Sequence, residues 1–124
     1  MTYRNFPHNL SSNVSPDAQN QNNMNLLNLF KNDHKHFKLH ISGEVQKVGF
    51  RRYARRQAKE LGLSGFVQYY YDDLYMEIEG KPNLVQSFVD DCRMGPSKAQ
   101  VEEFQMEEGK YQGFGRFKIL RSIR

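Results

Sequence analysis

The sequence predicts an α+β fold in which an antiparallel sheet carries two helices on one face, preceded by a disordered N-terminal tail. Three observations lead to this prediction. Asparagine and glutamine are frequent up to about Lys35, strand-like alternation of apolar residues begins at Phe37, and two segments with helical spacing separate the strand-like ones. We therefore expect a tail over residues 1–35 and one domain over residues 36–124.

The tail is predicted from its composition. It has few large apolar side chains before Met24, so burial cannot offset the entropy lost on ordering it. The mean hydropathy of the whole chain, −0.81, fits a domain diluted by such a segment. The stretch MNLLNLF, Met24 to Phe30, is either a short amphipathic helix that docks on the domain or a partner, or a fraying lead-in, which we favour.

The first half of the domain is predicted from its apolar periods. Phe37, Leu39 and Ile41 alternate with polar residues, which predicts a half-buried strand, and a loop follows over Gly43–Gly49. A helix then runs to a stop at Gly62. One face of it is formed by residues at helical spacing, with the basic residues mostly on the other faces: Phe50, Tyr53, Ala54, Gln57, Ala58 and Leu61.

The second half of the domain is predicted to contain a hairpin, a second helix and two further strands. Residues 65–71 and 74–79 are strand-like and flank Asp72-Asp73, which predicts a tight hairpin. Pro82 suits the start of a second helix that ends at Gly95-Pro96. Its apolar residues are Leu84, Val85, Phe88, Val89 and Cys92. Alternation predicts a fourth strand through Ala99, Val101 and Met106 and a fifth through Phe117 and Ile119.

The resulting order, β-α-β-β-α-β with one additional strand, predicts the ferredoxin-like split β-α-β sandwich. Many functions share this fold, so the function has to be inferred from the site. The single cysteine, Cys92, excludes an intramolecular disulfide and is expected in the core. No run of residues is long and apolar enough for a membrane span, and the N-terminus lacks a secretory signal. We expect a cytoplasmic monomer with no membrane contact.

A net charge of +4 and a pI near 9.2 favour anionic ligands, from phosphate esters to nucleic acid. The loop before the first helix indicates where an anion would bind. Such a loop directs several backbone N–H groups to one point, and the helix dipole adds partial positive charge there. Arg51, just inside the helix, can offer a planar guanidinium to two phosphate oxygens. We favour this role over that of an ordinary exposed helix arginine.

The residues at this loop carry a resemblance to a known family. The stretch GEVQKVGFR, Gly43 to Arg51, resembles the signature loop of acylphosphatases. The stretches AKELGL at Ala58–Leu63 and GFVQ at Gly65–Gln68 follow in register. So do Gly80, the helix containing Phe88, and GPSKAQV at Gly95–Val101. The similarity covers about Phe37 to Ile119.

The resemblance implies hydrolysis of acyl phosphates to carboxylate and phosphate without a metal or cofactor. By carry-over, the backbone amides of residues 46–50 and the Arg51 side chain bind the phosphate, which names Gln46, Lys47, Val48, Gly49, Phe50 and Arg51. The implied catalytic residues are Arg51 and the residue that orients the attacking water. The implied partners are an acyl phosphate or inorganic phosphate.

Two positions depart from the family pattern. Tyr69 stands where the family has the asparagine that orients water, and we expect it to occupy the water's place. Gln68 carries an amide, but neighbouring strand residues face opposite sides. Lys47 stands where the family usually has glycine. It is strained if the backbone there has positive φ; otherwise its ammonium adds charge beside the phosphate. We favour tolerance with a small electrostatic benefit.

Three functions remain open from the sequence. The first is an acylphosphatase with weak or altered activity, and the second is a catalytically silent relative that binds phosphate or an acyl phosphate. The third and weakest is a nucleic-acid-binding module, based on a basic helix and Tyr69-Tyr70-Tyr71. We do not expect nucleic acid as a partner, because acidic residues balance the basic ones: Asp72, Asp73, Glu77, Glu79, Asp90, Asp91, Glu102, Glu103, Glu107 and Glu108.

Two further groups of side chains are predicted to be solvated. His34, His36 and His40 lack the spacing of a compact zinc site, so we expect a solvated lead-in to the first strand. Arg52, Arg55, Arg56 and Lys59 are expected on an exposed helix face, paired with Glu60 and its neighbours.

Overall fold

The computed structural model describes residues 33–124. The predictions for residues 1–32, including Met24–Phe30, lie outside the described residues. The order of elements within the described part is β1 (Lys35–Glu44), α3 (Phe50–Glu60), β2 (Ser64–Tyr70), β3 (Asp73–Gly80), α4 (Pro82–Met94), β4 (Gln100–Gly109) and β5 (Phe117–Ile119). This is the predicted ferredoxin-like order with one additional strand.

The sheet has five strands in the order β4-β1-β3-β2-β5. The pairs β1–β3, β1–β4 and β2–β3 are antiparallel. The prediction of an antiparallel sheet is wrong at one edge, because β5 pairs parallel with β2, with Gly65 opposite Phe117. The chain reverses direction after β4 and reaches the far edge of the sheet, so β5 runs the same way as β2.

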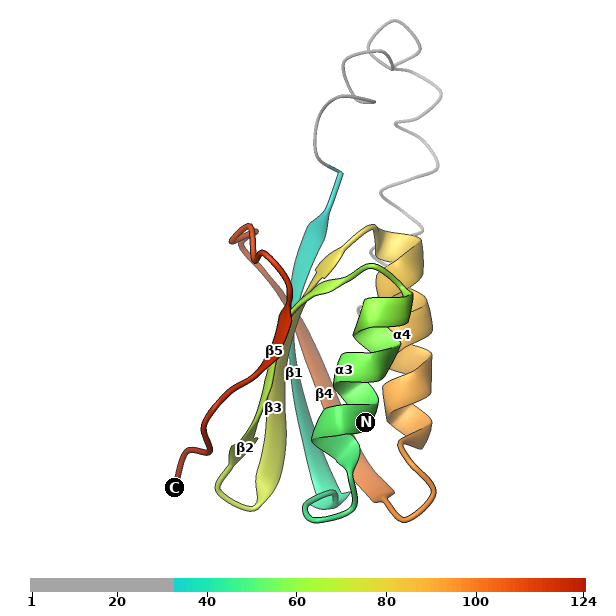
Figure 1. The fold of residues 1–124 in the computed structure, drawn as a ribbon, viewed down its shortest axis with the longest axis vertical. Helices are drawn as coiled ribbons and strands as arrows, with labels where there is room; N and C mark the ends of the chain where they lie inside the picture. Colours follow the sequence, from blue (N-terminus) through green and yellow to red (C-terminus); the bar gives the residue numbers. More distant parts are fainter. Residues whose placement is uncertain (1–32) are drawn as a thin grey trace, which may run out of the picture.

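Both helices lie on one face of the sheet, α3 beside α4 (Figure 1), as predicted. The core lies between these layers. Phe37, Leu39 and Ile41 of β1 are buried there, and so are Phe50, Ala54 and Ala58 of α3. Cys92 of α4 is also buried, as its helical position predicted. Among residues 33–124, no helix combines the length and apolarity that crossing a bilayer requires.

The first strand begins earlier than its apolar pattern indicated. Lys35 and His36 already pair with Gly80 and Glu79 of β3. The His36 side chain is 1% exposed, with Nδ1 2.6 Å from Glu79 Oε2 and Nε2 3.0 Å from Glu77 Oε1. The prediction of a solvated histidine lead-in is therefore wrong for His36, because two carboxylates of β3 supply partners that the local sequence does not show.

The hairpin between β2 and β3 turns one residue earlier than predicted. Tyr70 pairs with Asp73, so the two-residue turn is Tyr71-Asp72. Tyr71 adopts a φ of 56°, in the left-handed region that two-residue hairpin turns require. This turn lies at the end of the sheet where β1 leads into α3, since Ile41 near the end of β1 pairs with Leu74 near the start of β3.

Candidate active site

The loop of residues 45–50, called here the 45–50 loop, connects β1 to α3 and is anchored at both ends. The side chains of Val45 and Phe50 are fully buried in the core. Between them, Gly49 forms the N-cap of α3 with φ 81° and ψ 15°, in the left-handed region. The loop amides therefore gather at the N-terminus of a helix, whose first turns leave N–H groups without intrahelical partners.

Lys47 also adopts the left-handed region, with a φ of 62°. The first of the two alternatives for this residue therefore applies to its backbone, since lysine is less stable than glycine in this conformation by about 1 kcal/mol. The alternative that we favoured, tolerance without strain, is therefore wrong for the backbone of Lys47, because the loop requires a left-handed residue at this position. The side chain of Lys47 is exposed.

The side chain of Gln46 connects the loop to the β2–β3 turn by hydrogen bonds. Its Nε2 donates to the carbonyl oxygen of Tyr71 at 2.7 Å and to that of Asp73 at 3.0 Å. The sequence analysis assigned Gln46 only a backbone role. The signal that could have indicated this contact is the pairing of β1 with β3, which brings the 45–50 loop and the hairpin turn to the same end of the sheet.

Tyr69 points from β2 to the 45–50 loop. Its side chain is 8% exposed, and its hydroxyl oxygen accepts a hydrogen bond from the backbone N–H of Lys47 at 2.8 Å. The neighbouring Gln68 faces the other side of the sheet, as strand alternation predicts, and its Nε2 donates to the carbonyl oxygen of Arg121 at 2.9 Å. The Gln68 amide is thus directed away from the loop.

Arg51 lies over the ring of Tyr69. The central guanidinium carbon is 3.9 Å from the ring centroid, a distance at which the cation is attracted to the aromatic face. Tyr69 thus contacts both the guanidinium, through its ring, and the Lys47 amide, through its hydroxyl. The structure therefore brings together Arg51, Tyr69 and the Lys47 amide, whereas Val48 and Phe50 direct their side chains into or against the core and can offer only backbone groups.

The electrostatics of this arrangement favour an anion. The first turn of α3 has no acidic residue, so nothing within that turn neutralises the positive end of the helix dipole. Arg51 and Lys47 add two cationic residues to this end of the domain. Loop amides, a helix N-terminus and a planar guanidinium together form a set of donors suited to the oxygens of a phosphoryl group.

Comparison with known sequences points in the same direction. The model of the acylphosphatase family matches residues 37–119. An acylphosphatase of a Nocardioides species is 39% identical over 80 residues, which cover 64% of this chain and 81% of the relative. An acylphosphatase of Thermotoga petrophila is 36% identical over 86 residues, which cover 68% of this chain and 96% of the relative.

Comparison with solved structures agrees. The structure of an acylphosphatase from Coxiella burnetii superposes with a TM-score of 0.69 at 26% sequence identity. The match covers 71% of this chain and 94% of that one. The part of the chain outside these matches is mainly N-terminal, since the family model begins at residue 37.

Proposed function

The chain belongs to the acylphosphatase family, and on this premise we propose that it binds acyl phosphates at the 45–50 loop and Arg51 and hydrolyses them slowly. The reaction adds water to the anhydride between an acyl and a phosphoryl group and releases a carboxylate, phosphate and a proton. The negative charge of the phosphoryl group lies on its oxygens. Binding those oxygens is the contribution that the loop amides and Arg51 would make.

Binding is supported by the donors that converge at one end of the domain. Two left-handed residues, Lys47 and Gly49, turn the chain at the helix N-terminus, and Gln46 holds the turned segment against the β2–β3 hairpin. The Arg51 guanidinium is already positioned by the Tyr69 ring. A site arranged in this way before the ligand arrives loses less entropy when it binds.

Slow turnover is supported by one observation, the hydrogen bond from the Lys47 N–H to the Tyr69 hydroxyl. Tyr69 occupies the strand position at which the family has its water-orienting asparagine. The hydroxyl engages a loop amide, so the phenol fills space beside the loop that a water molecule would need. Removing one positioned polar group from such a site lowers the rate by about 10² to 10³, and we expect a deficit of this order.

The same observation also favours a second candidate, a silent relative that binds phosphate or an acyl phosphate without turnover. Both candidates need an intact loop and Arg51. They differ in whether any water can reach the phosphorus while Tyr69 is present. The two functions are therefore distinguished by turnover, not by binding.

The test is hydrolysis of a simple acyl phosphate, such as benzoyl phosphate, by the wild-type chain and by Arg51→Ala and Tyr69→Asn. We expect wild-type turnover above the Arg51→Ala background and faster turnover in Tyr69→Asn. Turnover in Tyr69→Asn alone would support the silent relative. If no variant turns over and inorganic phosphate binds wild type and Arg51→Ala equally, the proposed site is wrong.

A further inference from the structure

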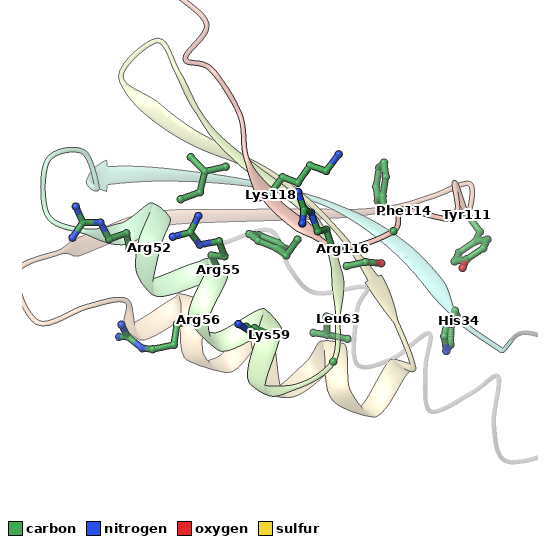
Figure 2. Close-up of a pocket in the computed structure, with 15 residues that line it drawn as sticks. His34, Arg52, Arg55, Arg56, Lys59, Leu63, Tyr111, Phe114, Arg116 and Lys118 are labelled. Atoms are coloured by element: carbon green, nitrogen blue, oxygen red, sulfur yellow. The ribbon is translucent and has the colours of Figure 1, made fainter.

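A second basic feature lies outside the 45–50 loop, in a groove between α3 and the segment that leads into β5. Figure 2 shows this groove, whose volume is about 1180 Å³. Among residues 33–124, the residues that line it include none that is acidic. Its six basic residues of the lysine and arginine type are Arg52, Arg55, Arg56, Lys59, Arg116 and Lys118.

One wall of the groove is a row of cations on α3. Arg52, Arg55, Arg56 and Lys59 follow the spacing i, i+3, i+4 and i+7, which places them on one side of the helix. All four side chains are exposed. Because a helix rises about 1.5 Å per residue, the row extends for roughly 10 Å along the groove.

The other wall comes from the segment at β5. Arg116 and Lys118 flank Phe117, which is buried in the core, and both basic side chains are exposed. Residues two apart in a strand are separated by roughly 7 Å. Phe117 faces the helix layer, so Arg116 and Lys118 on either side of it point to the opposite face of the sheet. Cations therefore lie along both edges of the groove (Figure 2), spread out instead of converging on one point.

Within the part of the chain that the structure describes, these charges have no ion-pair partners. The pairing with Glu60 that the sequence suggested does not occur, and across residues 33–124 none of the six basic side chains takes part in an ion pair. Several acidic residues of the domain have their own partners elsewhere: Asp73 lies 2.8 Å from His40, and Glu77 and Glu79 contact His36. The numbers of acidic and basic residues are similar in the domain, but at the groove the described lining carries basic residues alone.

Aromatic rings line the same groove beyond its cationic part. Tyr111 is 42% exposed and Phe114 is half-buried. Figure 2 shows both rings toward one end of the groove, away from Arg52 and Arg55. Dispersed cations together with an accessible aromatic ring match the chemistry of a nucleic-acid strand, whose phosphates repeat along the backbone and whose bases stack on aromatic faces.

We propose that this groove binds single-stranded nucleic acid, with phosphates along the α3 and β5 walls and a base on Tyr111. This binding is independent of the hydrolysis proposed above, since Arg51 and Tyr69 do not line the groove. A small phosphate ester would use only part of the cationic surface. An anionic polymer without bases would use the charges and gain nothing from Tyr111.

The experiment uses the full chain and a fluorescein-labelled oligothymidylate of about 12 nucleotides, with binding followed by anisotropy between roughly 50 and 200 mM salt. Lys59→Gln/Lys118→Gln removes one lysine from each wall. Lys81→Gln/Lys98→Gln is the matched control, since it removes the same charge from two exposed lysines outside the groove. Tyr111→Ala tests stacking, with inorganic polyphosphate as the competitor that has no bases.

We expect the groove pair of substitutions to weaken oligonucleotide binding about tenfold and to reduce the salt slope by roughly 1.4, while the control pair has a much smaller effect. Tyr111→Ala should weaken binding of the oligonucleotide but not of polyphosphate. Equal losses of oligonucleotide affinity in the two double-lysine variants, or no binding at low salt, would show that the groove is not the binding site. An unchanged oligonucleotide affinity in Tyr111→Ala would overturn its assignment to nucleic acid.

Discussion

The hydroxyl oxygen of Tyr69 lies 2.8 Å from the backbone nitrogen of Lys47, so one loop amide that could bind phosphate already has a partner within the protein. The same tyrosine ring supports the Arg51 guanidinium. Tyr69 therefore acts on the proposed site in two opposing ways, since its ring positions a cation and its hydroxyl engages a donor. These two effects can be separated by substitution.

The substitution Tyr69→Phe should tighten the binding of inorganic phosphate. It keeps the ring under Arg51 but removes the acceptor that competes for the Lys47 N–H. We expect the dissociation constant of phosphate to fall by about three- to tenfold. Isothermal titration calorimetry measures the effect. Tyr70→Phe serves as the control because Tyr70 lies on the other side of β2. Weaker phosphate binding in Tyr69→Phe would show that the hydroxyl donates to the anion.

The substitution Gln46→Ala should weaken phosphate binding by about three- to tenfold, because it removes two hydrogen bonds that hold the loop against residues 71–73. The backbone amide of residue 46 is retained, so any loss reports on loop position. Phosphate titration followed by NMR is the measurement. Gln68→Ala removes one glutamine-to-backbone hydrogen bond on the opposite face, and an equal loss in that variant would contradict a specific role for Gln46.

The substitution Lys47→Gly should stabilise the domain by about 0.5–1 kcal/mol, because glycine adopts the φ of 62° without steric cost. The gain is partial because glycine also increases the entropy of the unfolded chain. Urea unfolding measures it. Lys47→Ala removes the same charge but keeps the strained backbone, so an equal gain in both variants would assign the effect to charge.

The substitution Glu79→Gln should destabilise the domain in a pH-dependent way. The buried Glu79 carboxylate accepts hydrogen bonds from the backbone N–H groups of residues 112–114 and from His36. Burial acts to raise the pKa of Glu79, but the hydrogen bonds from Gln112 and His36, joined by those of residues 113–114, lower it below the ordinary value of 4.5. A carboxyl group with a lowered folded-state pKa stabilises the fold above the unfolded-state pKa, and this contribution disappears as the pH falls through the folded-state pKa.

At pH 7 we expect the free energy of unfolding of Glu79→Gln to be lower than that of wild type by about 2–3 kcal/mol. The difference should shrink as the pH is lowered through the titration of Glu79. Urea unfolding at several pH values between neutral and acid conditions checks this. Glu108→Gln removes a partly exposed partner of Lys35 and should change stability by less than about 0.5 kcal/mol. A pH-independent difference for Glu79→Gln would contradict the carboxylate's role.

Much of the fold could be predicted because local signals agreed with one another. Alternation at Phe37, Leu39 and Ile41 and helical spacing from Phe50 both survive in the structure as buried positions. The parallel pairing of β5 and the early start of β1 could not be predicted in this way. Both depend on partners distant in sequence, Gly65 with Phe117 and His36 with Glu79, and local periodicity contains no information about such partners.

The candidate site shows the same division between sequence and structure. The loop motif and its arginine were evident from Gly43–Arg51, and so was the replacement at Tyr69. The hydrogen bond that Tyr69 makes to the Lys47 N–H was not evident from the sequence. The position of the phenol oxygen depends on how β2 lies against the 45–50 loop. The bracing contact of Gln46 and the groove between α3 and β5 likewise join elements that are far apart along the chain.

By itself, the sequence determined the order of strands and helices, the location of an anion-binding loop at a helix N-terminus and the unusual residues at positions 47 and 69. These follow from backbone preference and apolar spacing, which act over a few residues. The tertiary structure alone decided that Tyr69 bonds to the Lys47 amide, that Arg51 lies over its ring, and that the described lining of the groove beside α3 has basic residues but no acidic ones. Those relationships depend on the register and packing of distant segments, because hydrogen bonds and charge interactions act only between groups that the fold has brought close together.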